Sequence, residues 1–113
     1  MAKDDYYVIV YQILSYLYSQ LKKGKDIEPE KLLHDGTLFN INYDYWVYIM
    51  VNMLEQGFIK GVNNANVGNG YYIVQQLKDI RITPKGIEYL CENSFIEKAK
   101  QFLKDVKEIT PFI

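Results

Sequence analysis

The chain has 113 residues, 49% hydrophobic and 24% charged, a balance typical of one soluble globular domain. Its single cysteine excludes a disulfide scaffold and fits a reducing cytoplasm, and no apolar stretch approaches the roughly 20 residues that span a bilayer. The 13 basic and 14 acidic residues give a net charge of −1, which excludes the strong global positive field of many nucleic-acid-binding proteins.

The first predicted helix begins near Tyr6, with Asp4 or Asp5 as its cap, and ends before Gly24. Its apolar residues cover more than half of its circumference. One buried stripe is predicted at Tyr7, Val10, Leu14, Leu17, Tyr18 and Leu21. A second apolar flank consists of Ile9, Ile13 and Tyr16. A helix with apolar residues on both the stripe and the flank is either a core helix contacted from several sides or a helix with a homodimer face.

The next segment predicts a short strand at Ile27 and a short helix that starts at Pro29 and continues through Leu33. A turn follows at Asp35 and Gly36. A long helix over 43–56 is then capped by Asn42 or, in the alternative register, by Asn40. Its predicted inner face is Trp46, Val47, Ile49, Met50, Met53 and Leu54, and Gly57 is expected just beyond its end.

Residues 58–62 have the pattern of a strand, and residues 71–74 that of a second one. The segment between them, 63–70, is rich in Asn and Gly, which tolerate the positive φ angles of tight turns. The two strands and their loop therefore predict a β-hairpin wing directly after the long helix. Apolar alternation resumes at Leu77, Ile80 and Ile82.

The stretch ITPKGIEYLCENS contains start and stop signals for two helices. Thr83 is a predicted N-cap with Pro84 at the first helical position, and Asn93 is a predicted stop. The expected core-facing residues of this helix are Ile87, Leu90 and a buried Cys91. Ser94 and Glu97 then form a capping box at the start of a last helix over about 94–109.

This order of elements predicts an α+β, mainly helical fold: a winged helix-turn-helix with a two- or three-stranded wing sheet and a C-terminal helical extension. We expect one domain over 1–113, with its core in about 5–92. An unrelated small α+β fold is the alternative.

The carboxyl-terminal third of the chain resembles the YjcQ-like family of small winged-helix proteins of Gram-positive bacteria and their phages. The shared pattern is Ile82-Thr83, Lys85-Gly86-Ile87-Glu88-Tyr89-Leu90, Glu92-Asn93-Ser94, Lys98-Ala99, Lys104 and Lys107. A second match is Leu54, Gly57-Phe58-Ile59 and Gly61-Val62. The resemblance implies a winged-helix fold and a phage or prophage origin, and it brings no reaction, ligand or catalytic residue.

No chemical motif emerges from the remaining residues. His34 is the only histidine and lies far from Cys91 in sequence, so no metal-ligand spacing is present. No nucleophile occupies a known catalytic signature, and Gly61, Gly68 and Gly70 are not followed by GK[ST]. We therefore predict a protein that is not an enzyme and uses no cofactor or metal.

The predicted fold favours a DNA-binding transcriptional regulator, and the alternative is a protein-interaction module that does not bind DNA. The helix over 43–56 would enter the major groove in a DNA-binding winged helix, yet it has no Lys or Arg. Candidate DNA or partner contacts are Tyr43, Tyr45, Tyr48, Asn52, Gln56, Lys60, Asn63, Asn64, Asn66 and Asn69. Candidate phosphate contacts are Lys22, Lys23 and Lys25. Tyrosine without lysine is also typical of protein-binding surfaces, which favours a host protein or a second copy as partner.

Overall fold

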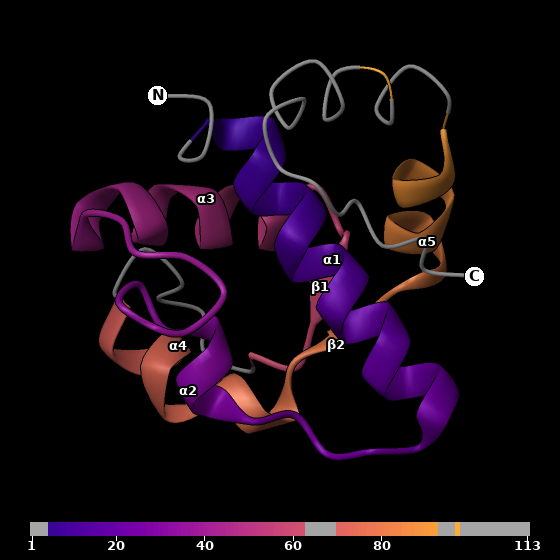
Figure 1. The fold of residues 1–113 in the computed structure, drawn as a ribbon, viewed down its shortest axis with the longest axis horizontal. Helices are drawn as coiled ribbons and strands as arrows, with labels where there is room; N and C mark the ends of the chain where they lie inside the picture. Colours follow the sequence, from indigo (N-terminus) through magenta and orange to yellow (C-terminus); the bar gives the residue numbers. More distant parts are fainter. Residues whose placement is uncertain (1–4, 63–69, 93–96, 98–113) are drawn as a thin grey trace.

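The computed structural model describes residues 5–62, 70–92 and 97 (Figure 1). They form a mainly helical α+β structure with one small antiparallel sheet. The elements are α1 (Tyr6–Lys23), α2 (Pro29–Leu32), α3 (Tyr43–Glu55), β1 (Ile59–Lys60), α4 (Gly70–Gln75), the 3-10 helix η2 (Leu77–Asp79), β2 (Arg81–Ile82) and α5 (Pro84–Cys91). Within the described segments, none of the helices has both the length and the apolar character needed to cross a membrane.

Helix α1 begins and ends where its local signals place it. The Asp5 carboxylate accepts a hydrogen bond from the Tyr7 backbone N–H at 3.0 Å, which satisfies one of the donors left open at a helix start. At the other end, Gly24 adopts a left-handed conformation with φ of 68°. Both predicted boundaries of this helix are therefore confirmed.

Helix α1 is the central element of the core. It passes over the small sheet and contacts β2 and α5 (Figure 1). Ile9 and Ile13 are 0% exposed, and the Tyr16 hydroxyl accepts a hydrogen bond from the Glu28 N–H at 2.9 Å. The interpretation as a core helix holds, and an exposed homodimer face at Ile9, Ile13 and Tyr16 is wrong because neighbouring elements cover this flank.

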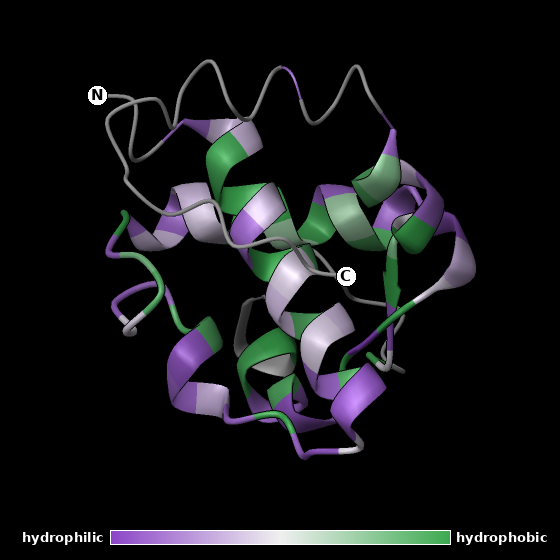
Figure 2. Ribbon diagram, turned by 45° about the vertical axis from the view of Figure 1, so that its right-hand side comes forward, coloured by the Kyte–Doolittle hydropathy of each residue, from purple (hydrophilic) through white to green (hydrophobic). Residues whose placement is uncertain are grey.

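The carboxyl end of α1 emerges from the core. In Figure 2 the apolar colouring of its first turns gives way to polar colouring toward Lys23. Val10, Leu14 and Leu17 of the predicted stripe are buried, whereas Leu21 is 47% exposed. The stripe therefore ends about one turn before the helix does.

The sheet consists of β1 and β2, which are antiparallel and pair Ile59 with Ile82 and Lys60 with Arg81. Residues directly opposite each other in an antiparallel pair project to the same face. Both isoleucines are buried, so the Ile59–Ile82 pair faces the core, and the Lys60–Arg81 pair projects to the opposite, outer face.

The predicted second wing strand at 71–74 is wrong, because this segment lies within the helix α4. The strand that pairs with β1 is β2, further along the chain. The buried residues of this region are Ile73, Leu77 and Ile80, at intervals of four and three residues, as is typical of helices. The neighbouring side chains favour strands, so the sequence pattern did not reveal this spacing. Ile27 is likewise buried without forming a strand. Most of the predicted Asn/Gly loop lies outside the described residues.

Helix α5 starts as predicted, with Thr83 as N-cap and Pro84 at the first helical position. The Thr83 hydroxyl accepts a hydrogen bond from the Gly86 N–H at 3.0 Å. The prediction of a buried Cys91 is wrong, since its side chain is exposed. The buried face is centred on Gly86 and Leu90, which are one turn apart, so Cys91 is rotated away from the core. The predicted stop at Asn93 and most of the helix at 94–109 lie outside the described residues.

The first turn of α5 lies directly against the chain that enters β1. The Thr83 N–H donates to the Phe58 carbonyl at 3.0 Å, and the Thr83 hydroxyl donates to the Gly57 carbonyl. A Cβ atom at Gly86 would overlap the Phe58 carbonyl oxygen and lie 2.9 Å from Cγ1 of Ile82. Only glycine therefore allows α5 to approach β1 this closely.

We predict that Gly86→Ala destabilises the protein by about 1–3 kcal/mol, because the new methyl group meets backbone that cannot move independently. The sign of this change in stability distinguishes close packing from an ordinary helix interior, where alanine is favoured over glycine by about 1 kcal/mol. Urea unfolding monitored by circular dichroism measures the change. Unchanged or increased stability would contradict the close packing of α5 on β1.

Candidate functional site

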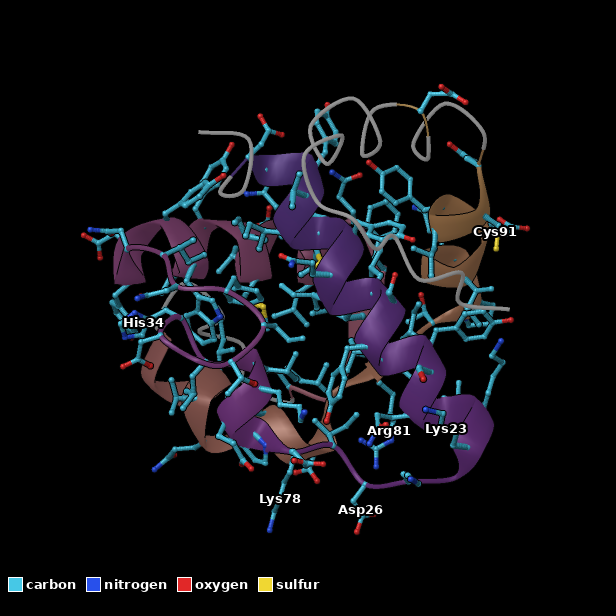
Figure 3. The ribbon with its side chains drawn as sticks, in the orientation of Figure 1. Lys23, Asp26, His34, Lys78, Arg81 and Cys91 are labelled. Carbon is cyan, nitrogen blue, oxygen red and sulfur yellow. The ribbon has the colours of Figure 1, made fainter. Side chains whose placement is uncertain are left out.

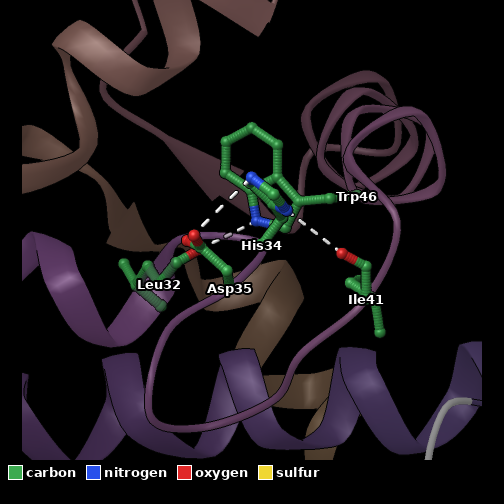
Figure 4. Close-up of polar contacts among 5 residues, drawn as sticks. All are labelled: Leu32, His34, Asp35, Ile41 and Trp46. Atoms are coloured by element: carbon green, nitrogen blue, oxygen red, sulfur yellow. Dashed lines mark hydrogen bonds and ion pairs between the residues drawn. The ribbon is translucent and has the colours of Figure 1, made fainter.

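Helix α3, the candidate recognition element, is fixed to the core by its inner face. Trp46, Ile49, Met50 and Met53 are buried, as the sequence predicts. The Trp46 indole N–H donates to the Leu32 carbonyl at 2.8 Å, which ties α3 to the end of α2 (Figure 4). The orientation of α3 about its own axis is therefore set by a completely buried tryptophan and its hydrogen bond.

His34 closes the loop between α2 and α3. Its backbone carbonyl accepts a hydrogen bond from the Ile41 N–H at 2.8 Å, and its Nδ1 lies 3.1 Å from the Ile41 carbonyl (Figure 4). Nε2 lies 3.9 Å from the Asp35 carboxylate, and the ring packs edge-on against Tyr43. These contacts give the only histidine a structural task at the entrance to α3. In the described part of the chain, no three His, Cys, Asp or Glu side chains group as metal ligands would.

The exposed face of α3 is acidic and aromatic. Asp44, Tyr48 and Glu55 are exposed at intervals of four and seven residues, which places them along one side of the helix. Tyr48 is the most exposed large hydrophobic side chain among the described residues, at 61%. Its backbone carbonyl accepts a hydrogen bond from the Asn52 amide at 2.7 Å. The exposed face of α3 therefore presents Tyr48 between the carboxylates of Asp44 and Glu55, and the helix has no Lys or Arg.

The remaining candidate residues on and near α3 differ in accessibility. Tyr43 is 40% exposed and stacks on Trp46 with ring centroids 5.9 Å apart. Tyr45 is half-buried and packs against the core, so it belongs to the scaffold more than to the surface. Gln56 is exposed at the end of the helix, and Lys60 is exposed on β1. Asn63, Asn64, Asn66 and Asn69 lie outside the described residues.

A group of tyrosines from different elements gathers beside Tyr48, and sequence spacing alone did not connect them. Tyr6 of α1 approaches Tyr48 edge-on at 6.4 Å between ring centroids and approaches Tyr7 at 5.4 Å. Tyr89 of α5 stacks on Phe58 at 4.4 Å. Burial, followed by the nearby Tyr7, Tyr6 and Glu92, raises the pKa of Tyr89 to about 12. Burial, followed by Tyr48 and Tyr7, also raises the pKa of Tyr6.

The cations lie away from α3. Lys22, Lys23 and Lys25 are exposed at and beyond the carboxyl end of α1, with the Lys22 ammonium 4.6 Å from the Tyr18 ring centroid. Arg81, which did not stand out in the sequence, joins Lys60 on the outer face of the sheet. The structure thus separates an acidic, tyrosine-bearing α3 from a basic edge at the sheet and the end of α1.

Comparison with known proteins identifies the family. The model of the YjcQ protein family matches residues 11–109, and the chain therefore belongs to this family. The resemblance found in the sequence is confirmed, and the match covers all described elements except the first turns of α1. Neither a curated protein nor a solved structure matches the chain significantly.

The start of α3 provides a direct test of how this helix is positioned. The Asn42 side chain accepts hydrogen bonds from the Asp44 N–H at 2.8 Å and the Tyr45 N–H at 3.3 Å. We predict that Asn42→Ala costs about 1 kcal/mol of stability. Asn40→Ala is the matched control and should change stability by less than about 0.5 kcal/mol. Urea unfolding compares them, and an equal effect of both substitutions would contradict the assignment of Asn42 as the cap.

The raised pKa of Tyr89 predicts a loss of stability at high pH. Below about pH 10 the phenol is protonated in the folded and unfolded chains alike. As the pH rises toward 12, the unfolded chain loses this proton first, so unfolding becomes easier. Tyr89→Phe should therefore make the decline in stability between about pH 9 and pH 11 shallower. The urea midpoints of both proteins at about pH 9 and pH 11 measure this loss of stability. An equal loss in the two proteins would contradict the raised pKa of Tyr89.

Proposed function

We propose that this member of the YjcQ family is a non-enzymatic binding protein of winged-helix type and phage or prophage origin, which binds a protein partner through the outer face of α3. The winged-helix assignment is supported by three helices that precede β1, by the antiparallel pairing of β1 with β2 across the intervening α4 and η2, and by the further helix α5. In this arrangement, α3 is the helix that precedes the sheet and presents its outer face to a partner.

The observation that carries the proposal is the exposure of Tyr48 on a rigid helix between Asp44 and Glu55. Tyrosine provides a large amphipathic contact area at a low entropy cost, and it is enriched in protein interfaces. The buried Trp46 and the capped first turn hold the helix in place, so little order has to be gained on binding. The neighbouring carboxylates favour a partner with a basic surface.

DNA is the less favoured partner for this face. A helix in the major groove lies between two phosphate backbones, and most non-specific affinity comes from cations that neutralise them. The exposed carboxylates of Asp44 and Glu55 would repel those backbones, and α3 has no cation to offset the repulsion. A DNA-binding regulator is the second candidate, and the cations that favour it lie on the outer face of the sheet.

We predict that a photo-crosslinking residue in place of Tyr48 captures protein from an extract of the native host, whereas the same residue in place of Leu21 does not. Leu21 is a suitable control because it is also a large exposed side chain, at 47%, on a different surface. The protein captured at position 48 should then bind the purified chain directly, with Tyr48→Ala weakening its affinity about tenfold or more, as expected for an interface hot spot.

Charge reversal tests the acidic component of the same face. The double substitution Asp44→Lys and Glu55→Lys should weaken binding of the captured protein, because its surface is expected to be basic. Adducts of equal yield at positions 21 and 48, or unchanged affinity after both charge reversals, would contradict a protein interface on α3. Urea midpoints of the variants show whether each remains folded.

A further inference from the structure

The outer face of the sheet carries two cations directly opposite each other. Lys60 and Arg81 are paired across β1 and β2, and their Cβ atoms project to the same side about 5 Å apart. Like charges in this position destabilise a strand pair. No described carboxylate lies within ion-pair distance of either side chain. Among the described residues the pair therefore has an unfavourable arrangement, which a bound anion would relieve.

Arg81 is held in place for such an anion. Its Nη1 donates to the Lys78 carbonyl at 2.9 Å and to the Ile80 carbonyl at 2.8 Å. These bonds orient the guanidinium without neutralising it, because a peptide carbonyl has no net charge. The Nη2 and Nε donors make no hydrogen bond to described residues. A guanidinium fixed on one side by carbonyls presents its other donors in the geometry that phosphate oxygens accept.

Other cations continue this surface. Lys78 lies in η2, just before Arg81 in the chain, and Lys23 projects at the same edge of the molecule in Figure 3. Asp26 lies at this edge as well, Asp79 is next to Lys78 in the chain, and Glu30 lies in α2, which packs against η2. His34 and the amino-terminal end of α3 lie on another side of the molecule (Figure 3). The side chains that carry these cations therefore lie apart from the acidic face of α3.

We infer that the Lys60–Arg81 pair, with Lys78 and Lys23, forms a binding surface for the phosphate backbone of a nucleic acid. The cationic groups are spread along an edge, so they suit a ligand with repeating phosphates better than a single phosphate ion. The contact involves no base readout and predicts sequence-independent, salt-sensitive binding. This inference is independent of the α3 interface, because the two surfaces use different side chains.

The test is fluorescence anisotropy of a labelled, mixed-sequence DNA duplex titrated with the full chain at several salt concentrations. We expect binding at about 50 mM salt that is strongly weakened at about 200 mM. Arg81→Gln and, separately, Lys60→Gln should each lower affinity at low salt and reduce the slope of log affinity against log salt by about one. Arg81→Lys keeps the charge and should preserve that slope.

Lys85→Gln is the matched control, since it removes one exposed cation on α5 that lies over the Phe58 ring at 6.0 Å. It should leave the salt slope unchanged, as should Tyr48→Ala on α3. Absence of duplex binding by the folded chain at low salt would overturn the inference. Equal slopes for Arg81→Gln and Lys85→Gln, loss of DNA binding in Tyr48→Ala, or binding that depends on Arg81 only with anionic phospholipid vesicles would overturn it as well.

Discussion

The close approach of α5 to the chain entering β1 is the contact on which the arrangement of the sheet depends. Thr83 binds two successive carbonyls, at Gly57 and Phe58, and Gly86 leaves room for the Phe58 carbonyl against the helix. Because Thr83 directly follows β2, these bonds fix β2 against β1 in the register that pairs Ile59 with Ile82. A slip of either strand by one residue would turn its buried isoleucine outward and its cation toward the core.

Local signals predicted the helix boundaries because each acts within a few residues of the chain. Asp5, Asn42 and Thr83 accept hydrogen bonds from backbone N–H groups two or three residues later, and Gly24 ends α1 through its own φ angle. The prediction of a strand at 71–74 is wrong because Tyr, Ile and Val favour strands in isolation. The tertiary structure overrides this preference: the segment forms α4, which buries Ile73, and η2 follows with the buried Leu77.

The candidate site could be predicted only in part, because exposure depends on how each helix is rotated against the core. Tyr45 and Tyr48 are equivalent by composition, yet the packing of Trp46 turns Tyr45 toward the core and Tyr48 toward solvent. Cys91 was assigned to the wrong face for the same reason. Arg81 is not among the predicted contacts, because its position opposite Lys60 depends on the pairing of two strands that lie twenty-one residues apart. Neither segment alone specifies that register.

The net charge of −1 is a sum that conceals how the charges are arranged. The carboxylates of Asp44 and Glu55 are exposed on α3, whereas Lys60 and Arg81 lie on the outer face of the sheet. Attraction at a few ångströms depends on these local groups, since charges on separate surfaces are screened from each other over about 10 Å of salt solution. A near-neutral chain can therefore carry an acidic surface and a basic surface at the same time. In this fold, the strand register and the rotation of α3 decide which charged side chains each surface presents.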